Sequence, residues 1–124
     1  MFNYKYIKGI DLLIKEIPAH LQYWHEFSKL QELNYNIRAI DEYYCDYTNI
    51  MTLIFSDVQE QYTIKLTLYN IDGDLNIDMV NGFGSGFAID EIFDSGEEKM
   101  YHIYSFESDN SFDLYCEKIK AELL

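Results

Sequence analysis

The chain has 124 residues and a formal net charge of −13 at pH 7, and 48% of its residues are hydrophobic. This length fits a single domain spanning residues 1–124, and the apolar content excludes a disordered chain. The charge disfavours nucleic acid and anionic membranes as partners, because both are themselves negatively charged.

The N-terminal part is predicted to contain one or two helices. Four aliphatic side chains recur at helical spacing, namely Ile10, Leu13, Ile14 and Ile17. Pro18 ends this helix, because a proline inside it removes a backbone donor and clashes with the preceding turn. Proline is tolerated at the first position of a new helix, so residues 18–27 are predicted to form a second short helix.

From residue 33 onward the hydrophobic period changes to two, which predicts strands with one buried and one solvated face. Ile64, Leu66 and Leu68 alternate with polar residues, so we expect these three side chains to point into the core. Seven strands are predicted, at about residues 33–45, 50–56, 61–69, 74–80, 86–93, 99–107 and 111–118.

The connections between these strands are short. Asp72-Gly73 is typical of a two-residue hairpin turn, and short connections imply antiparallel pairing. The predicted fold class is therefore α+β, with one or two N-terminal helices packed on a meandering antiparallel sheet of about seven strands, in which curling is an open alternative.

Three patterns partly match known ligand sites, and each departs from the site in a decisive feature. His20 and His25 are five residues apart, which places them on different faces of a helix. The glycine-rich residues 82–86 precede a strand pattern rather than the helix that a phosphate loop needs. The acids of residues 72–78 lack the glycine and glutamate positions of a calcium loop. We therefore expect no metal, no cofactor and no catalytic residue.

Negative charge is concentrated in the second part of the chain. Residues 1–40 hold five Lys or Arg and four acids, whereas residues 41–124 hold four Lys and eighteen acids. Such a field attracts basic partners, and tyrosines beside carboxylates supply contact area. The candidate partner-binding residues are Asp72, Asp74, Asp78, Asp90, Glu91, Asp94, Glu97, Glu98, Tyr43, Tyr44 and Tyr47. The alternative interpretation is that the acids are solvated and the tyrosines pack in the core.

The chain also carries no sign of export. Its N-terminus lacks the apolar run of a signal peptide, and its longest apolar stretches are too short to span a membrane. Cys45 and Cys116 are too far apart for a metal-binding motif. We expect two reduced thiols in a cytosolic protein.

Residues 24–120 resemble the small acidic immunity proteins that accompany bacterial polymorphic toxins. The resemblance rests on the Trp24-His25-Glu26 step before a long strand, on the run of alternating strands, and on the closing segment Phe112-Asp113-Leu114-Tyr115-Cys116. It implies a protein that binds and neutralises one toxin domain inside the producing cell without catalysis. Binding residues are not shared within such families, so the resemblance assigns none here.

Together these observations predict a non-catalytic cytoplasmic immunity protein whose partner is a cognate basic toxin, most simply a nuclease. Two alternatives stay open. One is a small-molecule-binding or enzymatic β-domain with its site inside a curled sheet. The other is a phage-encoded inhibitor that mimics DNA.

Overall fold

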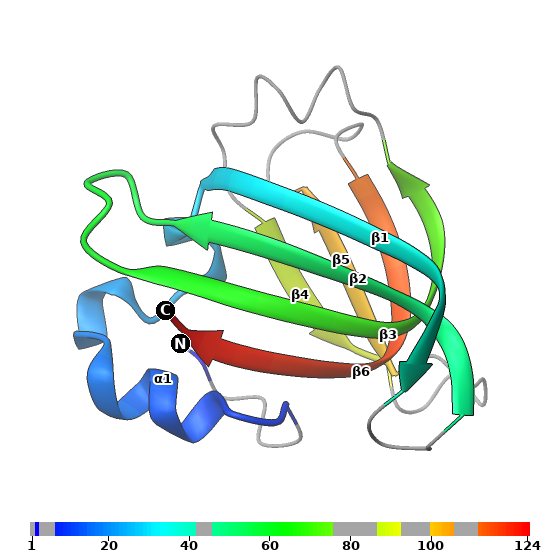
Figure 1. The fold of residues 1–124 in the computed structure, drawn as a ribbon. Helices are drawn as coiled ribbons and strands as arrows, with labels where there is room; N and C mark the ends of the chain where they lie inside the picture. Colours follow the sequence, from blue (N-terminus) through cyan, green and yellow to red (C-terminus); the bar gives the residue numbers. More distant parts are fainter. Residues whose placement is uncertain (1, 3–6, 42–45, 76–86, 93–99, 106–111) are drawn as a thin grey trace.

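The computed structural model describes residues 2, 7–41, 46–75, 87–92, 100–105 and 112–124. Side chains at residues 38–41, 46–47, 74–75, 105 and 112 are outside this description. In the described residues the chain forms one α-helix, two 3₁₀ turns and six β-strands (Figure 1). The α+β class is confirmed.

The first predicted helix is present as α1 (Ile10–Glu16). Ile10, Leu13 and the following Ile17 are buried, whereas Ile14 is 39% exposed and does not join the core. The helix ends where Gln22 folds back on it. The Gln22 Nε2 donates hydrogen bonds to the carbonyl oxygens of Ile14 (2.9 Å) and Ile17 (2.7 Å), which lack intrahelical partners at a helix end.

The second short helix expected over residues 18–27 is not one continuous helix. Residues 18–27 instead form two 3₁₀ turns, η1 (Ala19–Leu21) and η2 (Trp24–Glu26). The buried apolar residues of this segment recur every three positions, at Leu21, Trp24 and Phe27. The extended backbone of Tyr23 separates the two turns, and both turns direct a side chain into the core, Leu21 from η1 and Trp24 from η2.

The strands form one antiparallel sheet in the order β1-β2-β3-β6-β5-β4. Their bounds are β1 (Lys29–Asp41), β2 (Asp46–Ser56), β3 (Thr63–Leu75), β4 (Phe87–Glu91), β5 (Tyr101–Ser105) and β6 (Phe112–Leu123). The antiparallel pairing is confirmed, but the simple meander is wrong because β3 pairs with β6 and β4 lies at the far edge. Strands β3 to β6 thus have the order of a Greek key. β1 and β4 are the two edges, so the sheet is not closed.

The predicted hairpin turn at Asp72-Gly73 is also wrong. β3 continues through both residues to Leu75, and Gly73 lies opposite Leu114 of β6. Gly73 has a φ of 125°, and a Cβ placed on it would lie 2.1 Å from the carbonyl oxygen of Asp113. The glycine is therefore required by the close approach of β6, not by a turn. The predicted strand at 74–80 begins inside β3, and residues 76–80 lie outside the described residues.

A corner divides β3 and β6 into two arms. Leu68 and Ile71 of β3 are both buried although they are three positions apart, and so are Cys116 and Ile119 opposite them. Strict alternation requires an even step, so the inward-facing phase changes between each pair. Asn70 makes this change in β3 with a left-handed φ of 56°.

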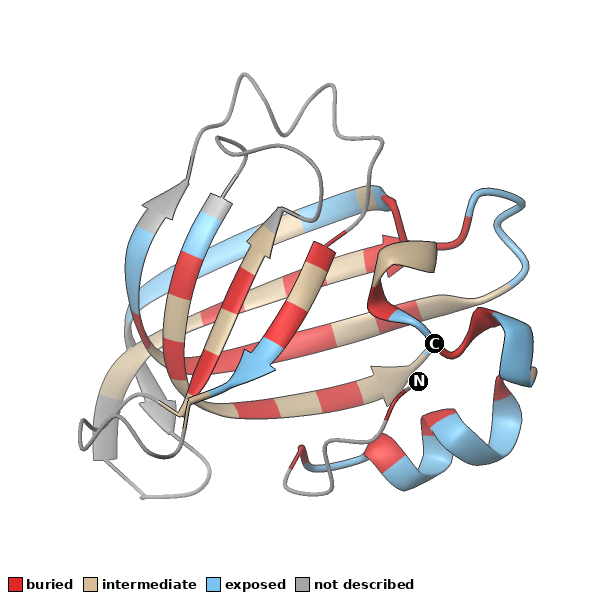
Figure 2. Cartoon of the chain, turned by 180° about the vertical axis from the view of Figure 1, so that it is seen from behind, coloured by how far each residue is buried: buried red, intermediate tan, exposed pale blue. Residues whose placement is uncertain are grey.

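The two arms belong to two walls that face each other across the core (Figure 1). The first wall consists of β1, β2, residues 63–69 of β3 and residues 118–123 of β6. The second wall consists of residues 71–75 of β3, residues 112–116 of β6, β5 and β4. Figure 2 shows the second wall nearest the viewer, with buried and less buried positions alternating along its strands.

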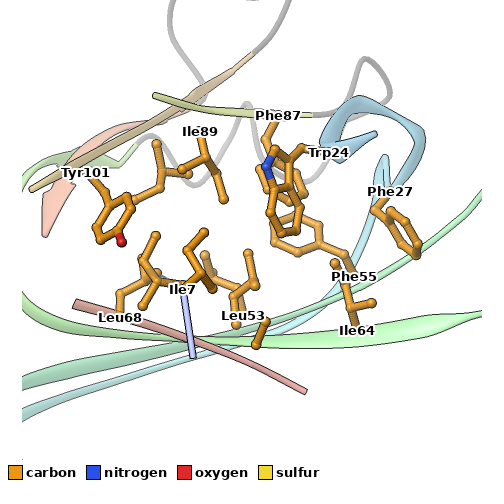
Figure 3. Close-up of a cluster of buried hydrophobic side chains, with 14 of the residues drawn as sticks. Ile7, Trp24, Phe27, Leu53, Phe55, Ile64, Leu68, Phe87, Ile89 and Tyr101 are labelled. Atoms are coloured by element: carbon orange, nitrogen blue, oxygen red, sulfur yellow. The ribbon is translucent and has the colours of Figure 1, made fainter. Parts of the chain in front are cut away.

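The core between the walls is apolar. Ile64, Leu66 and Leu68 are each 0% exposed, which confirms their predicted inward orientation. Phe55 of the first wall stacks on Phe87 of the second, with ring centroids 4.3 Å apart (Figure 3). η2 packs against β4 and places Trp24 against Phe87, with centroids 5.8 Å apart.

Candidate protein-binding face

The register of the second wall brings residues from four strands into one row. Asp72 lies opposite Tyr115, Tyr115 lies opposite His102, and His102 lies opposite Asp90. Neighbouring strands are about 4.8 Å apart, so the row extends over about 14 Å. Two acids that are 18 positions apart in the sequence thus lie at the two ends of a single row.

This row points away from the core. Its members alternate along their strands with buried residues, such as Leu114 and Ile103, so they occupy the solvent face of the sheet. The next row on the same face contains Asp113 and Tyr104, which are register partners. We call this surface the His102 face and define it by Asp72, Asp90, His102, Tyr104, Asp113 and Tyr115.

Three rings lie together at the centre of the His102 face. The ring of His102 is stacked on that of Tyr115, with centroids 4.4 Å apart and planes 5° from parallel. It is also stacked on Tyr104 of its own strand, with centroids 4.7 Å apart. The His102 side chain keeps 23% of its surface exposed. The rings therefore form a partly exposed aromatic stack with His102 in contact with both tyrosines.

Carboxylates contact two of these rings. An Asp113 carboxylate oxygen contacts the Nε2 of His102, and the Tyr104 hydroxyl donates a 3.0 Å hydrogen bond to Oδ2 of Asp90. The Asp113 side chain is 53% exposed, and Asp72 and Asp90 are exposed as well. An ionised carboxylate has about four acceptor sites, so each can take further donors while it keeps these contacts.

The His102 face carries three aspartates. Among the described side chains of the second wall no Lys or Arg occurs, whereas Lys65, Lys118 and Lys120 lie in the first wall. The same two strands, β3 and β6, thus carry lysines on one side of the corner and aspartates on the other. The face can attract cations through both its carboxylates and its rings.

The predicted binding residues have different outcomes in this arrangement. Asp72 and Asp90 are brought together on the His102 face, and Glu91 is exposed at the end of β4. Asp74 lies opposite Asp113 in β3 and Tyr47 lies opposite Ile40 in β2, but neither side chain is described. The remaining predicted residues, Asp78, Asp94, Glu97, Glu98, Tyr43 and Tyr44, lie outside the described residues.

Sequence reasoning missed the centre of the face. His102, Tyr104, Asp113 and Tyr115 were not among the candidate binding residues. Their alternation with buried residues does indicate a solvated face. Their proximity to each other depends on the pairing of β5 with β6, which the sequence pattern alone does not reveal.

The other candidate ligand groups stay separate. His20 lies in η1 and His25 in η2, where the His25 Nε2 is 3.7 Å from a carboxylate oxygen of Glu26. Over the described ranges, no three His, Cys, Asp or Glu side chains are placed to hold a metal ion. Cys116 is buried, and Cys45 lies outside the described residues. No helix in the described part of the chain is long and apolar enough to cross a membrane.

Comparison of the chain with models of protein families, with curated proteins and with solved structures finds no match. The chemistry of the His102 face therefore has to be interpreted from its own residues.

Proposed function

We propose that this chain is a non-catalytic immunity protein that binds and neutralises a cognate basic toxin domain, such as a nuclease, in the cytoplasm. The observation that carries the proposal is the His102 face. It gathers three aspartates and three aromatic rings on an open sheet surface, and no lysine or arginine occurs among the described side chains of its wall. A nuclease presents a positive cleft to nucleic acid, and an acidic surface of this kind can cover it.

The composition of the face supports protein binding over simple solubility. Protein interfaces are enriched in tyrosine, because its ring supplies area and its hydroxyl a hydrogen bond. Tyr104 and Tyr115 are only half-buried, and the two stacking contacts of His102 hold both rings in place. A surface whose only role is solubility has no need of ordered aromatic side chains between its carboxylates.

The interior supports this proposal over a small-molecule site inside the sheet. Such a site needs polar groups that converge in a cavity. The described core between the walls is lined by aliphatic and aromatic side chains, with Phe55, Phe87 and Trp24 in mutual contact (Figure 3). Among the described residues, the one buried side-chain polar atom without a partner is Nε1 of Trp24.

The test uses the protein encoded by the gene adjacent to that of this chain. We expect the neighbouring protein to be toxic when expressed alone, and co-expression of this chain to restore growth. In vitro, association measured by stopped-flow fluorescence should slow by at least about ten-fold between 50 mM and 500 mM salt, because salt screens electrostatic steering.

Two matched triple variants locate the interface. Asp72→Lys, Asp90→Lys and Asp113→Lys together change the net charge from −13 to −7, and so do Glu16→Lys, Glu32→Lys and Glu60→Lys together. We expect the first set to slow association at least about ten-fold and abolish rescue of growth, and the second to change the rate by less than about three-fold. Equal effects of the two sets would contradict the proposed interface, and rescue without complex formation would contradict the binding mechanism.

A further inference from the structure

The His102 face has a feature that a purely electrostatic interface does not require. Its carboxylates do not stand alone but flank a stack of flat rings. To bind an acidic surface, the ammonium group of a lysine needs only negative charge and water around it. A planar cation can use the ring faces and the carboxylates together.

We propose that the His102 face binds arginine side chains of a basic protein in preference to lysine side chains. The proposal rests on the proposed function for its partner, a basic protein, and names the chemical group that the face recognises. The occupant is the guanidinium group, which stacks on aromatic rings and accepts two-point pairing with a carboxylate.

The geometry of the rings supports a planar ligand. The planes of His102 and Tyr115 are only 5° from parallel, so they offer one common stacking direction. The planes of His102 and Tyr104 differ by 28°, which keeps the third ring close to the same direction. A guanidinium lying on an outer ring of this stack is oriented as the rings are.

The carboxylates lie beside the rings. Asp113 is in contact with His102, Asp90 with the Tyr104 hydroxyl, and Asp72 is the register neighbour of Tyr115. Each ring of the stack thus has one aspartate beside it. Guanidinium carries five N–H donors in a rigid fork and is more weakly hydrated than ammonium, so it loses less on leaving water for this surface.

The spacing also suits an extended basic segment. Alternate side chains of an extended peptide lie about 7 Å apart, so two or three arginines fit along a row of about 14 Å. No Lys or Arg occurs among the described side chains of the second wall. The charge of the face and the charge of such a segment are complementary.

The test compares hexa-arginine with hexa-lysine, which have equal length and charge. Binding of each fluorescently labelled peptide to the full chain is measured by anisotropy at 50 mM and 150 mM salt. We expect the dissociation constant of hexa-arginine to be at least about five-fold lower. Tyr115→Leu should raise the hexa-arginine value to that of hexa-lysine and change the hexa-lysine value by less than about two-fold. Tyr115→Phe keeps the ring and should keep the preference.

A matched control comes from a second tyrosine–histidine pair. The rings of Tyr23 and His25 are 5.4 Å apart, outside the His102 face. Tyr23→Leu should leave the preference for arginine unchanged. Circular dichroism and thermal melts establish that each variant is folded, and Tyr104→Leu replaces Tyr115→Leu if the latter is not.

The outcomes separate the two proposals. If both peptides bind equally, or if the preference persists in folded Tyr115→Leu, arginine recognition is wrong while the toxin proposal stands on its growth and rate measurements. If neither peptide binds at 50 mM salt, arginine recognition is likewise wrong. A preference that Tyr115→Leu and Tyr23→Leu reduce equally shows a non-specific effect of tyrosine loss and also overturns it.

Discussion

The two walls of this sheet share the long strands β3 and β6, yet their outer faces differ in charge. Before the corner, β3 carries Lys65 outward, opposite Glu122 of β6. After the corner, β3 carries Asp72 outward, opposite Tyr115, and the row continues to Asp90. The described side chains of the first wall include both lysines and glutamates, whereas the charged side chains described in the second wall are all acidic.

This difference indicates that the side chains of the inner and outer faces are determined by different physical requirements. Inside, both walls supply the same kind of side chain, because the core is shared and must be close-packed. Outside, a stable sheet does not need like charges near each other, since cross-strand like charges are destabilising. The accumulation of aspartates on one wall is therefore better explained by binding than by folding.

The shared core should give the largest effect on stability. Leu66 is 0% exposed and lies opposite Leu53 and Ala121. We expect Leu66→Ala to lower the free energy of unfolding by about 2–5 kcal/mol through lost burial and the cavity left behind. Urea unfolding measures the change, and Ile37→Ala on the exposed part of β1 should change it by less than about 0.5 kcal/mol. A loss below about 1 kcal/mol for Leu66→Ala would mean that the inward phase of β3 is wrong.

The backbone of the second wall should give the next largest effect. Gly73→Ala places a Cβ 2.1 Å from the Asp113 carbonyl oxygen at a φ of 125°. Strain and overpacking each cost about 1–3 kcal/mol, so we expect a loss of about 2–4 kcal/mol. The neighbouring exposed substitution Asp72→Ala is the control and should cost less than about 1 kcal/mol. If Gly73→Ala is as mild as its control, β3 does not approach β6 closely here.

The connection between the walls should give a smaller loss. The Asn49 side chain of β2 accepts a hydrogen bond from the Ile71 amide and donates one to its carbonyl oxygen, both at 2.7 Å. Asn49→Ala leaves these backbone groups at the corner without side-chain partners, and we expect a loss of about 1–3 kcal/mol in chemical unfolding. Asn34→Ala, on the exposed part of β1, should be nearly neutral. Equal effects would show that Asn49 does not support the corner.

The sequence predicted those features that depend on neighbours along the chain. The inward orientation of Ile64, Leu66 and Leu68 follows from strict alternation in a strand. The sequence pattern did not reveal the corner, because the left-handed Asn70 shifts the inward-facing phase of the side chains inside a continuous strand. Gly73 was wrongly interpreted as part of a turn. The His102 face required the pairing of β3 with β6 and of β6 with β5, and such distant pairings leave no local signal.

The smallest predicted effect is the change in stability when one surface charge is reversed. The sign of this change should differ between the two outer faces. Lys65→Glu places a glutamate opposite Glu122, and like charges directly opposite are destabilising, so we expect a loss of about 0.2–1 kcal/mol. Asp72→Lys removes one negative charge from a wall that has accumulated them, so stability should stay equal or rise by up to about 0.5 kcal/mol. Both changes should shrink toward zero at 1 M salt, where the screening length is about 3 Å. Thermal melts of both variants at 50 mM and 1 M salt provide the measurement. Losses of the same sign and size at low salt would mean that the two walls do not differ electrostatically. The proposed binding role of the His102 face would then lose the charge accumulation on which it rests.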